Sequence, residues 1–262
     1  MRNSPIGIFD SGVGGLTIYE EIHKLLPNEN IIYLADSKNA PYGEKSKEEI
    51  IDISVKNTEF LLSKGCKLIV VACNTASTNA VKYLREHYAI PFIRVQPAIK
   101  PAAINSKTKV VGILATKGTL KSELLFETSQ RFAKGVKVIE QVGEGLVTLI
   151  ESGKMHSSEM TSLLHKYIDP MLHKNIDHLV LGCTHYPFLT DQIKEIVGKR
   201  VDILDSGEAI ARQTKVILTE ENLLNLETGD ISRIFYTNKD PQVMQQILDE
   251  FDEEFEAIKT NF

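Results

Sequence analysis

Short apolar runs alternate along the chain with longer stretches in which apolar positions recur at helical spacing. The runs that we expect to form strands are Ile6–Phe9, Ile31–Leu34, Leu68–Ala72, Phe92–Val95, Val110–Leu114, Val136–Ile139, Leu179–Leu181, Val201–Leu204 and Ile234–Tyr236. The stretches that we expect to form helices include Ser46–Leu62, Asn79–His87, Ser122–Phe132, Ser157–Leu172 and Asp191–Val197. Nearly continuous apolar strands that alternate with helices predict an α/β fold built on parallel sheets.

Two pairs of segments suggest an internal repeat. The similar segments are, pair by pair, Ile6–Ser11 with Val111–Thr116 and Leu68–Thr75 with Leu179–His185. Similar units in the same order predict two related α/β halves, although short apolar strands also resemble one another by chance. If a pseudo-two-fold axis relates the halves, corresponding strand ends face each other across a cleft, with Cys73 and Cys183 on opposite walls.

The chain ends in an acidic stretch, Asp249–Glu256, with two phenylalanines four residues apart. At helical spacing, Phe251 and Phe255 fall on one face. We therefore expect a docked helix with a solvated acidic face rather than a binding tail.

The length, composition and charge of the chain limit which classes of function it can have. The chain has 262 residues, 42% hydrophobic and 25% charged, and a net charge of −5. This composition is typical of a globular protein with one large or two modest domains. Because nonspecific nucleic-acid binding depends on phosphate neutralisation by basic residues, we expect no nucleic-acid partner. We find neither a secretory signal nor an apolar run of about 18 residues. We therefore expect a cytoplasmic protein without membrane contact.

Three cysteines in a reducing compartment predict no disulfide framework. Cys66 precedes a strand without polar neighbours, so we interpret it as packing. Cys73 and Cys183 each end an apolar run and are followed by small or hydroxyl residues and then a helix. The carboxyl end of a parallel strand is where ligands of α/β folds bind, and a helix N-terminus there favours a thiolate. A thiolate on one wall and a thiol on the other could invert a carbon centre by removing and replacing its proton.

Asp10 opens a glycine-rich turn between the first strand and a helix. The spacing matches neither the dinucleotide fingerprint nor the P-loop, so we do not expect a phosphate loop. Asp10 could be a simple turn or cap residue. It could also hold an ammonium group or tune a nearby thiol.

His185 lies two residues beyond Cys183, where an imidazole can exchange protons near neutral pH. A metal site would need further ligands, and no paired cysteine or histidine spacing supplies them, so we expect no metal. A hydrolytic cysteine nucleophile would leave the second thiol unexplained. Polar residues near the strand ends are helix caps if taken singly, but together they suit a carboxylate ligand: Ser11, Asn74, Thr75, Thr116 and Thr184.

Four motifs resemble the bacterial glutamate racemases in order and approximate spacing. They are Phe9-Asp-Ser-Gly-Val-Gly-Gly15, Ala40-Pro-Tyr-Gly43, Val71-Ala-Cys-Asn-Thr-Ala-Ser77 and Leu181-Gly-Cys-Thr-His-Tyr-Pro187. The resemblance covers essentially the whole chain. It implies interconversion of L- and D-glutamate without pyridoxal phosphate or another cofactor, which would supply D-glutamate for peptidoglycan.

The resemblance also assigns roles to residues. Cys73 would act on the α-hydrogen of D-glutamate with help from Asp10, and Cys183 on that of L-glutamate with help from His185. The residues that would contact the substrate are Ser11, Tyr42, Gly43, Asn74, Thr75, Thr184 and His185, to which we add Thr116.

The resemblance further implies two similar α/β domains, residues 1–97 with 209–262 and residues 98–208, and a homodimer. Some relatives carry an N-terminal extension linked to activation by a cell-wall precursor. This chain begins at the first motif, so we do not expect that regulation. Val95-Gln96-Pro97 departs from the pattern, where glutamate would precede the proline.

Other functions remain open at this point. A racemase for another amino acid, such as aspartate, would share the two thiols, since pocket depth decides side-chain length. A non-catalytic sensor could bind an amino acid but would need neither the paired thiols nor His185. Nothing in the sequence supports or excludes an added interaction role, such as the gyrase inhibition associated with some relatives.

Overall fold

The chain divides into two compact units in a computed structural model that describes residues 2–227, 229–251 and 254–262. The first unit comprises Met1–Val95 and Gly207–Phe262, and the second comprises Gln96–Ser206. The sequence predicted that the chain passes from one unit to the other after residues 97 and 208, two residues later in each case than it does in the structure. Within the described ranges, no helix is long and apolar enough to cross a membrane.

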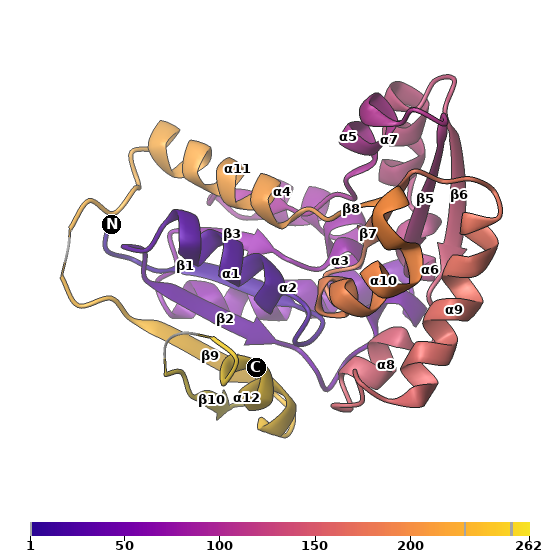
Figure 1. The fold of residues 1–262 in the computed structure, drawn as a ribbon. Coiled ribbons are helices and arrows are strands. Elements are labelled where there is room, and N and C mark those ends of the chain that lie inside the picture. The colour runs from indigo at the N-terminus through magenta and orange to yellow at the C-terminus, as the bar shows by residue number, and fades with distance from the viewer. Residues whose placement is uncertain (1, 228, 252–253) are drawn as a thin grey trace. The chain divides into compact units, whose positions relative to one another are not determined.

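The first unit is built on a parallel sheet in the strand order β10-β9-β2-β1-β3-β4 (Figure 1). The strands are β1 (Ile6–Asp10), β2 (Ile31–Ala35), β3 (Leu68–Val71), β4 (Phe92–Arg94), β9 (Arg233–Thr237) and β10 (Ala257–Lys259). Every residue of β1, β2 and β3 is buried, as their continuous apolar sequences predict. The returning C-terminal segment adds β9 beside β2, with Ala35 paired to Thr237.

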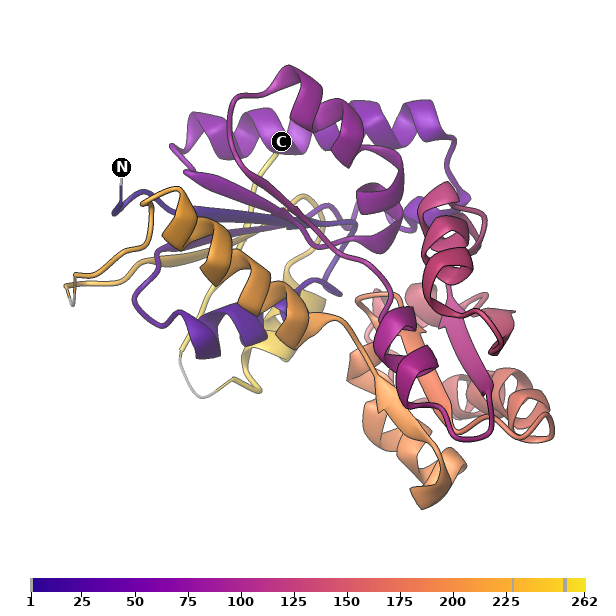
Figure 2. The ribbon, with the colours of Figure 1, turned by 90° about the horizontal axis from the view of Figure 1, so that it is seen from above.

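Helices cover both faces of this sheet, α1 and α11 on one side and α2 and α4 on the other (Figure 2). Their bounds are α1 (Leu16–Leu25), η1 (Tyr42–Glu44), α2 (Lys47–Ser63), α3 (Asn74–Asn79), α4 (Val81–His87), α11 (Gly207–Glu220) and α12 (Gln242–Leu248). A reciprocal capping box between Ser46 and Glu49 begins α2. The helix predicted over Asn79–His87 is present as α4, which begins at Val81 after a break at Ala80 that separates it from α3.

The second unit contains a parallel sheet in the order β6-β5-β7-β8. Its elements are α5 (Ile99–Asn105), β5 (Val110–Ala115), α6 (Lys117–Leu120), α7 (Glu123–Phe132), β6 (Lys137–Val142), α8 (Leu146–Ile150), α9 (Ser158–Leu172), β7 (His178–Gly182), η2 (Tyr186–Leu189), α10 (Thr190–Val197), η3 (Gly198–Arg200) and β8 (Asp202–Leu204). The α/β class with parallel sheets is thus confirmed.

The helix expected over Asp249–Glu256 is wrong for its described residues. α12 ends at Leu248, and the residues that follow form turns and irregular chain before β10. Asp252 and Glu253 lie outside the described residues. Phe251 and Phe255 nevertheless dock, because each ring packs against Tyr19. Aromatic packing and the need to extend into β10 outweigh the helical spacing.

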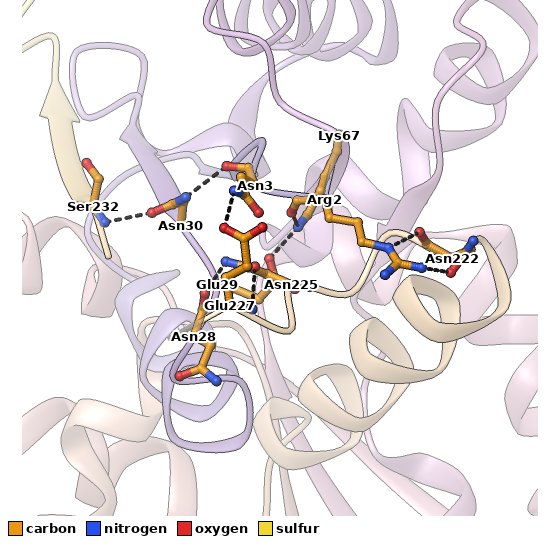
Figure 3. Close-up of polar contacts among 10 residues, drawn as sticks. All are labelled: Arg2, Asn3, Asn28, Glu29, Asn30, Lys67, Asn222, Asn225, Glu227 and Ser232. Atoms are coloured by element: carbon orange, nitrogen blue, oxygen red, sulfur yellow. Dashed lines mark hydrogen bonds and ion pairs between the residues drawn. The ribbon is translucent and has the colours of Figure 1, made fainter. Parts of the chain in front are cut away.

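A buried ion pair anchors the amino edge of the first sheet, where Lys67 pairs with Glu29 (Figure 3). The other carboxylate oxygen of Glu29 accepts the backbone N–H of Asn225 at 2.8 Å, and the Asn225 side chain donates to the Asn28 carbonyl at 2.7 Å. Asn225 belongs to the segment between α11 and β9. The pair therefore holds the returning C-terminal segment against the N-terminal strands.

Candidate active site

The first thiol lies just beyond the carboxyl end of β3. Cys73 is the N-cap of α3, and its sulfur accepts the backbone N–H of Ala76 at 3.5 Å. The thiol lies 3.7 Å from the Ser11 hydroxyl, to which it can donate. Cys73 is 5% exposed, and Ser11 is also buried. An N–H aimed at sulfur favours the thiolate, and a thiol can instead donate to the hydroxyl, so the site accommodates both protonation states.

Asp10 ends β1, the strand beside β3, and is fully buried. Its Oδ2 accepts the backbone N–H of Gly15 at 3.0 Å across the glycine-rich turn. A Cβ at Gly15 would lie 2.8 Å from the Asp10 Cβ and 2.9 Å from the Ala72 Cβ. Glycine is therefore required by close packing, and the turn holds the Asp10 carboxylate at the same strand edge as Cys73.

Four further predicted residues lie on α3 or on η1, the short helix that packs against it. Tyr42 is buried on η1 and packs in the same apolar cluster as Cys73. Burial first, and then the negative charges of Asp36 and of ionised Cys73, raise the Tyr42 pKa. Thr75 and Asn74 form the buried first turn of α3, and half-buried Gly43 follows Tyr42.

One donor in this group has no protein partner. The Asn74 side-chain nitrogen is buried and makes no hydrogen bond to any part of the chain that the structure describes. An unsatisfied buried amide costs about 1–3 kcal/mol, which a ligand oxygen would recover. Asn74 is therefore the strongest structural sign of a ligand in the first unit.

The second thiol follows β7 in the other unit. Cys183 Sγ lies 3.8 Å from Nδ1 of His185, and Nε2 of His185 lies 2.8 Å from Oε1 of Glu151. All three residues are buried, with His185 1% and Glu151 6% exposed. When His185 is neutral, its Nε2–H donates to the Glu151 carboxylate and its Nδ1 faces the thiol as a hydrogen-bond acceptor. The imidazole is thus poised to take the Cys183 proton.

Glu151 is the functional residue that the sequence did not reveal. It follows the last residue of α8 and belongs to none of the recognised motifs. Gly145, in the left-handed region with φ 82°, begins that short helix. Only the fold brings Glu151 to His185, 34 residues further along the chain.

The loop after Cys183 is rigidly packed. Tyr186 is fully buried, and its hydroxyl donates to the Gly143 carbonyl at 3.2 Å. A Cβ at Gly143 would lie 2.4 Å from that hydroxyl oxygen, so the close approach requires glycine. Burial, followed by the charge of ionised Cys183, raises the Tyr186 pKa and keeps the phenol protonated.

The remaining predicted residues of the second unit lie at the same strand edge. Thr184 is buried beside Cys183. Thr116 follows β5, whose last residue Ala115 pairs with Gly182 of β7. The Thr116 hydroxyl caps α6 by accepting the Thr119 N–H at 3.3 Å. Each unit therefore gathers its own thiol and the predicted polar residues around it, while the pairing of the two thiols stays a prediction.

Metal-ligating side chains do not cluster within the described ranges, where no group of three or more histidine, cysteine, aspartate or glutamate residues could hold an ion.

Comparison with known proteins completes this picture. Residues 6–214 match the family model described as Asp/Glu/Hydantoin racemase. The chain belongs to this racemase family. A glutamate racemase of Herpetosiphon aurantiacus is 47% identical over 241 residues, which is 92% of this chain and 95% of the relative.

Solved structures agree. The racemase resembles Escherichia coli glutamate racemase in complex with L-glutamate and the activator UDP-MurNAc-ala, with a TM-score of 0.87, 34% identity, and coverage of 98% of this chain and 97% of that one. It also resembles Francisella tularensis glutamate racemase in complex with D-glutamate, with a TM-score of 0.82, 30% identity and 98% coverage of both chains. The chain is thus a racemase of the glutamate racemase type.

Proposed function

We propose that this racemase interconverts L- and D-glutamate by proton transfer between two thiols and the α-carbon. The support for the substrate comes from relatives, since structural neighbours hold L-glutamate and D-glutamate. The support for the chemistry is the buried Cys183–His185–Glu151 arrangement, which is the observation that carries the proposal. A chain that only bound an amino acid would not need a thiol with its own proton acceptor.

In the L-to-D direction, the Cys183 thiol first passes its proton to His185, and Glu151 stabilises the imidazolium. The thiolate then removes the α-proton of L-glutamate. The Cys73 thiol donates its proton to the opposite face of the carbanion and becomes a thiolate. Protons balance. The α-proton ends on Cys183, the Cys73 proton ends on carbon, and the proton that Cys183 first gave up stays on His185. The turnover therefore leaves Cys73 as the thiolate and His185 as the imidazolium, and proton exchange with solvent restores the starting state.

In the reverse direction, Cys73 begins as the thiolate. The N–H of Ala76 stabilises that charge, and Asp10 at the adjacent strand end would assist by accepting the Cys73 proton. No step requires pyridoxal phosphate or a metal, so we propose a cofactor-independent reaction.

Neutral donors would hold the substrate carboxylates, because Asn74 already presents an unsatisfied buried amide. We assign the same role to the hydroxyls of Ser11, Thr75, Thr116 and Thr184 and to the backbone at Tyr42 and Gly43. We further propose that the enzyme acts as a homodimer in the cytoplasm and supplies D-glutamate for peptidoglycan.

The decisive test is solvent deuterium exchange at the α-carbon of each glutamate enantiomer, using dialysed protein treated with a chelator. We expect exchange and racemisation with both enantiomers. Cys73→Ala and Cys183→Ala should each abolish racemisation and keep the fold, as measured by circular dichroism. Cys66→Ala is the matched control and should stay active, because Cys66 precedes β3 at the amino edge of the sheet, whereas Cys73 follows β3 at the opposite edge.

Full racemase activity in Cys73→Ala or Cys183→Ala would contradict the two-thiol mechanism. Comparable rates with aspartate and glutamate would contradict the substrate assignment.

A further inference from the structure

Four neighbouring strands of the first sheet, in the order β9-β2-β1-β3, end in polar residues at one edge. Asn238 follows β9, Asp36 follows β2, Asp10 ends β1, and Cys73 lies just beyond β3. Parallel strands bring their carboxyl ends to the same edge of a sheet. Asp36 and Asn238 therefore lie at the thiol edge, although neither belongs to the racemase motifs.

Asp36 is the centre of a buried hydrogen-bond network. Its carboxylate accepts from the Tyr42 hydroxyl, from the side-chain amide of Asn238, and from Asn39 at 2.8 and 3.1 Å. Its backbone N–H donates to the Asp10 carbonyl at 3.0 Å. Asp36 is 1% exposed, and its bonds to Tyr42 and Asn238 are buried and therefore shielded from water. Asp36 therefore links three parts of the fold. Its carboxylate binds Tyr42 and Asn238, and its backbone binds the end of β1 at Asp10.

The network fixes the orientation of the Tyr42 side chain. The Tyr42 hydroxyl donates to Asp36 and accepts from the Asn57 side chain at 3.1 Å. A phenol held as both donor and acceptor cannot swing its hydroxyl to another position without breaking a buried hydrogen bond. Tyr42 packs in the same cluster as Cys73, and Gly43 directly follows it. The positions of Tyr42 and Gly43 in the Cys73 site thus depend on Asp36.

Asn238 in turn holds Asp36. It donates to the carboxylate and accepts the backbone N–H of Lys38 at 2.9 Å. Burial raises the Asp36 pKa against the opposing effect of its four side-chain hydrogen bonds. The described ion pairs include none to Asp36, so amide and hydroxyl donors alone stabilise its charge. Removing a donor leaves a buried carboxylate less satisfied and free to move.

We infer that Asp36 and Asn238 are positioning residues for the Cys73 half of the reaction, so that the returning C-terminal segment contributes to catalysis through Asn238. The inference rests on the proposed two-thiol function. Asp36 and Asn238 act only through Tyr42 and the loop that carries Gly43. The competing explanation is that Asn238 merely stabilises the pairing of β9 with β2.

Asn225 provides a matched control for that explanation. It is a buried asparagine of the same C-terminal segment, but it bonds at the amino edge of the sheet beside Glu29, away from the thiol edge (Figure 3). Asn225→Ala and Asn238→Ala each remove side-chain hydrogen bonding between this segment and the N-terminal part of the chain. Only Asn238→Ala touches the Asp36 network.

The experiment measures kcat and primary deuterium isotope effects with D- and L-[2-²H]glutamate for wild type, Asp36→Asn, Asn238→Ala and Asn225→Ala. Misplacement at a reacting centre costs about 10- to 100-fold in kcat, which we expect for Asp36→Asn, with a smaller loss for Asn238→Ala. Because Cys73 would remove the D-enantiomer's proton, the isotope effect should rise with D-glutamate and fall with L-glutamate. Asn225→Ala should lower the unfolding midpoint without changing either isotope effect.

The inference would be overturned if Asn238→Ala and Asn225→Ala changed each isotope effect by the same amount. Asn238 would then have only a structural role. If Asp36→Asn fails to fold, Tyr42→Phe keeps the inference testable, because it retains the Asp36–Asn238 pair. In Tyr42→Phe the isotope effect should likewise rise with D-glutamate and fall with L-glutamate. Unchanged isotope effects in Tyr42→Phe would also overturn it. Failure of the wild-type enzyme to exchange the α-proton would instead refute the proposed function itself.

Discussion

Replacing Glu151 with glutamine tests the proposed role of the second thiol. The substitution keeps the side-chain shape beside His185 Nε2 and removes only the negative charge, now 2.8 Å from the imidazole. In the proposed reaction, His185 becomes cationic when it takes the Cys183 proton. Glu151 therefore stabilises a charge that exists only after that transfer, so its loss should slow the reaction more than it weakens binding.

The magnitude follows from the geometry. Two unit charges about 4 Å apart interact by about 4 kcal/mol at an effective dielectric of about 20, which suits this buried pair better than the value of water. The glutamine amide retains a hydrogen bond, so we expect a loss of about 2–4 kcal/mol. This corresponds to a fall in kcat of about 30- to 1000-fold.

The assay compares kcat and KM for both enantiomers, followed by circular dichroism, with isotope effects from α-deuterated substrates. The isotope effect should rise with L-glutamate, the opposite of the Asp36→Asn pattern, because Cys183 would remove the L-proton. Glu159→Gln, an exposed site on α9, is the control and should keep wild-type kinetics. A Glu151→Gln enzyme within about threefold of wild type in kcat, with unchanged isotope effects, would refute the reasoning.

Two further predictions concern the fold. Burial raises the Cys66 pKa to about 12 from 9.0, a stabilisation present below pH 9 and lost as the pH rises toward 12. The stability difference between wild type and Cys66→Ala should therefore shrink by about 1.4 kcal/mol between pH 8 and 10 in urea titrations, and a constant difference would contradict this. Lys67→Met should cost about 3–5 kcal/mol by leaving Glu29 buried without its cation, whereas exposed Lys24→Met should cost under about 1 kcal/mol. Equal costs in denaturant unfolding would show that the buried pair is not needed.

Much of this fold can be predicted from the sequence, because the apolar runs and motifs that predict it are local. All nine predicted strands are present. The continuous apolar runs of β1, β2, β3 and β7 form strands that are buried along their whole length, whereas β6 and β8 have no fully buried residue. The Cys73 and Cys183 contexts could be recognised because each thiol and its nearest helpers lie within a few residues of one strand end. The strand β10 was missed because only its first residue is buried.

The helical prediction for the acidic end failed for a different reason. Phe251 and Phe255 satisfy helical spacing, but both pack on Tyr19 from irregular chain. Periodicity shows which side chains can share a face, and it does not show what those side chains will contact. The same limit explains why the predicted start at Asn79 is two residues too early, because a break at Ala80 separates α4 from α3.

The sequence by itself determined the α/β class, the racemase family and the thiols with their adjacent residues, because hydrophobic period and motif spacing act over short distances. Only the tertiary structure decided which distant side chains complete each thiol's surroundings. Glu151 reaches His185, and Asn238 reaches Asp36, through strand order and helix packing that bring remote segments to one sheet edge. Nothing in a single carboxylate or amide, read in its local sequence, distinguishes it from a solvated surface residue.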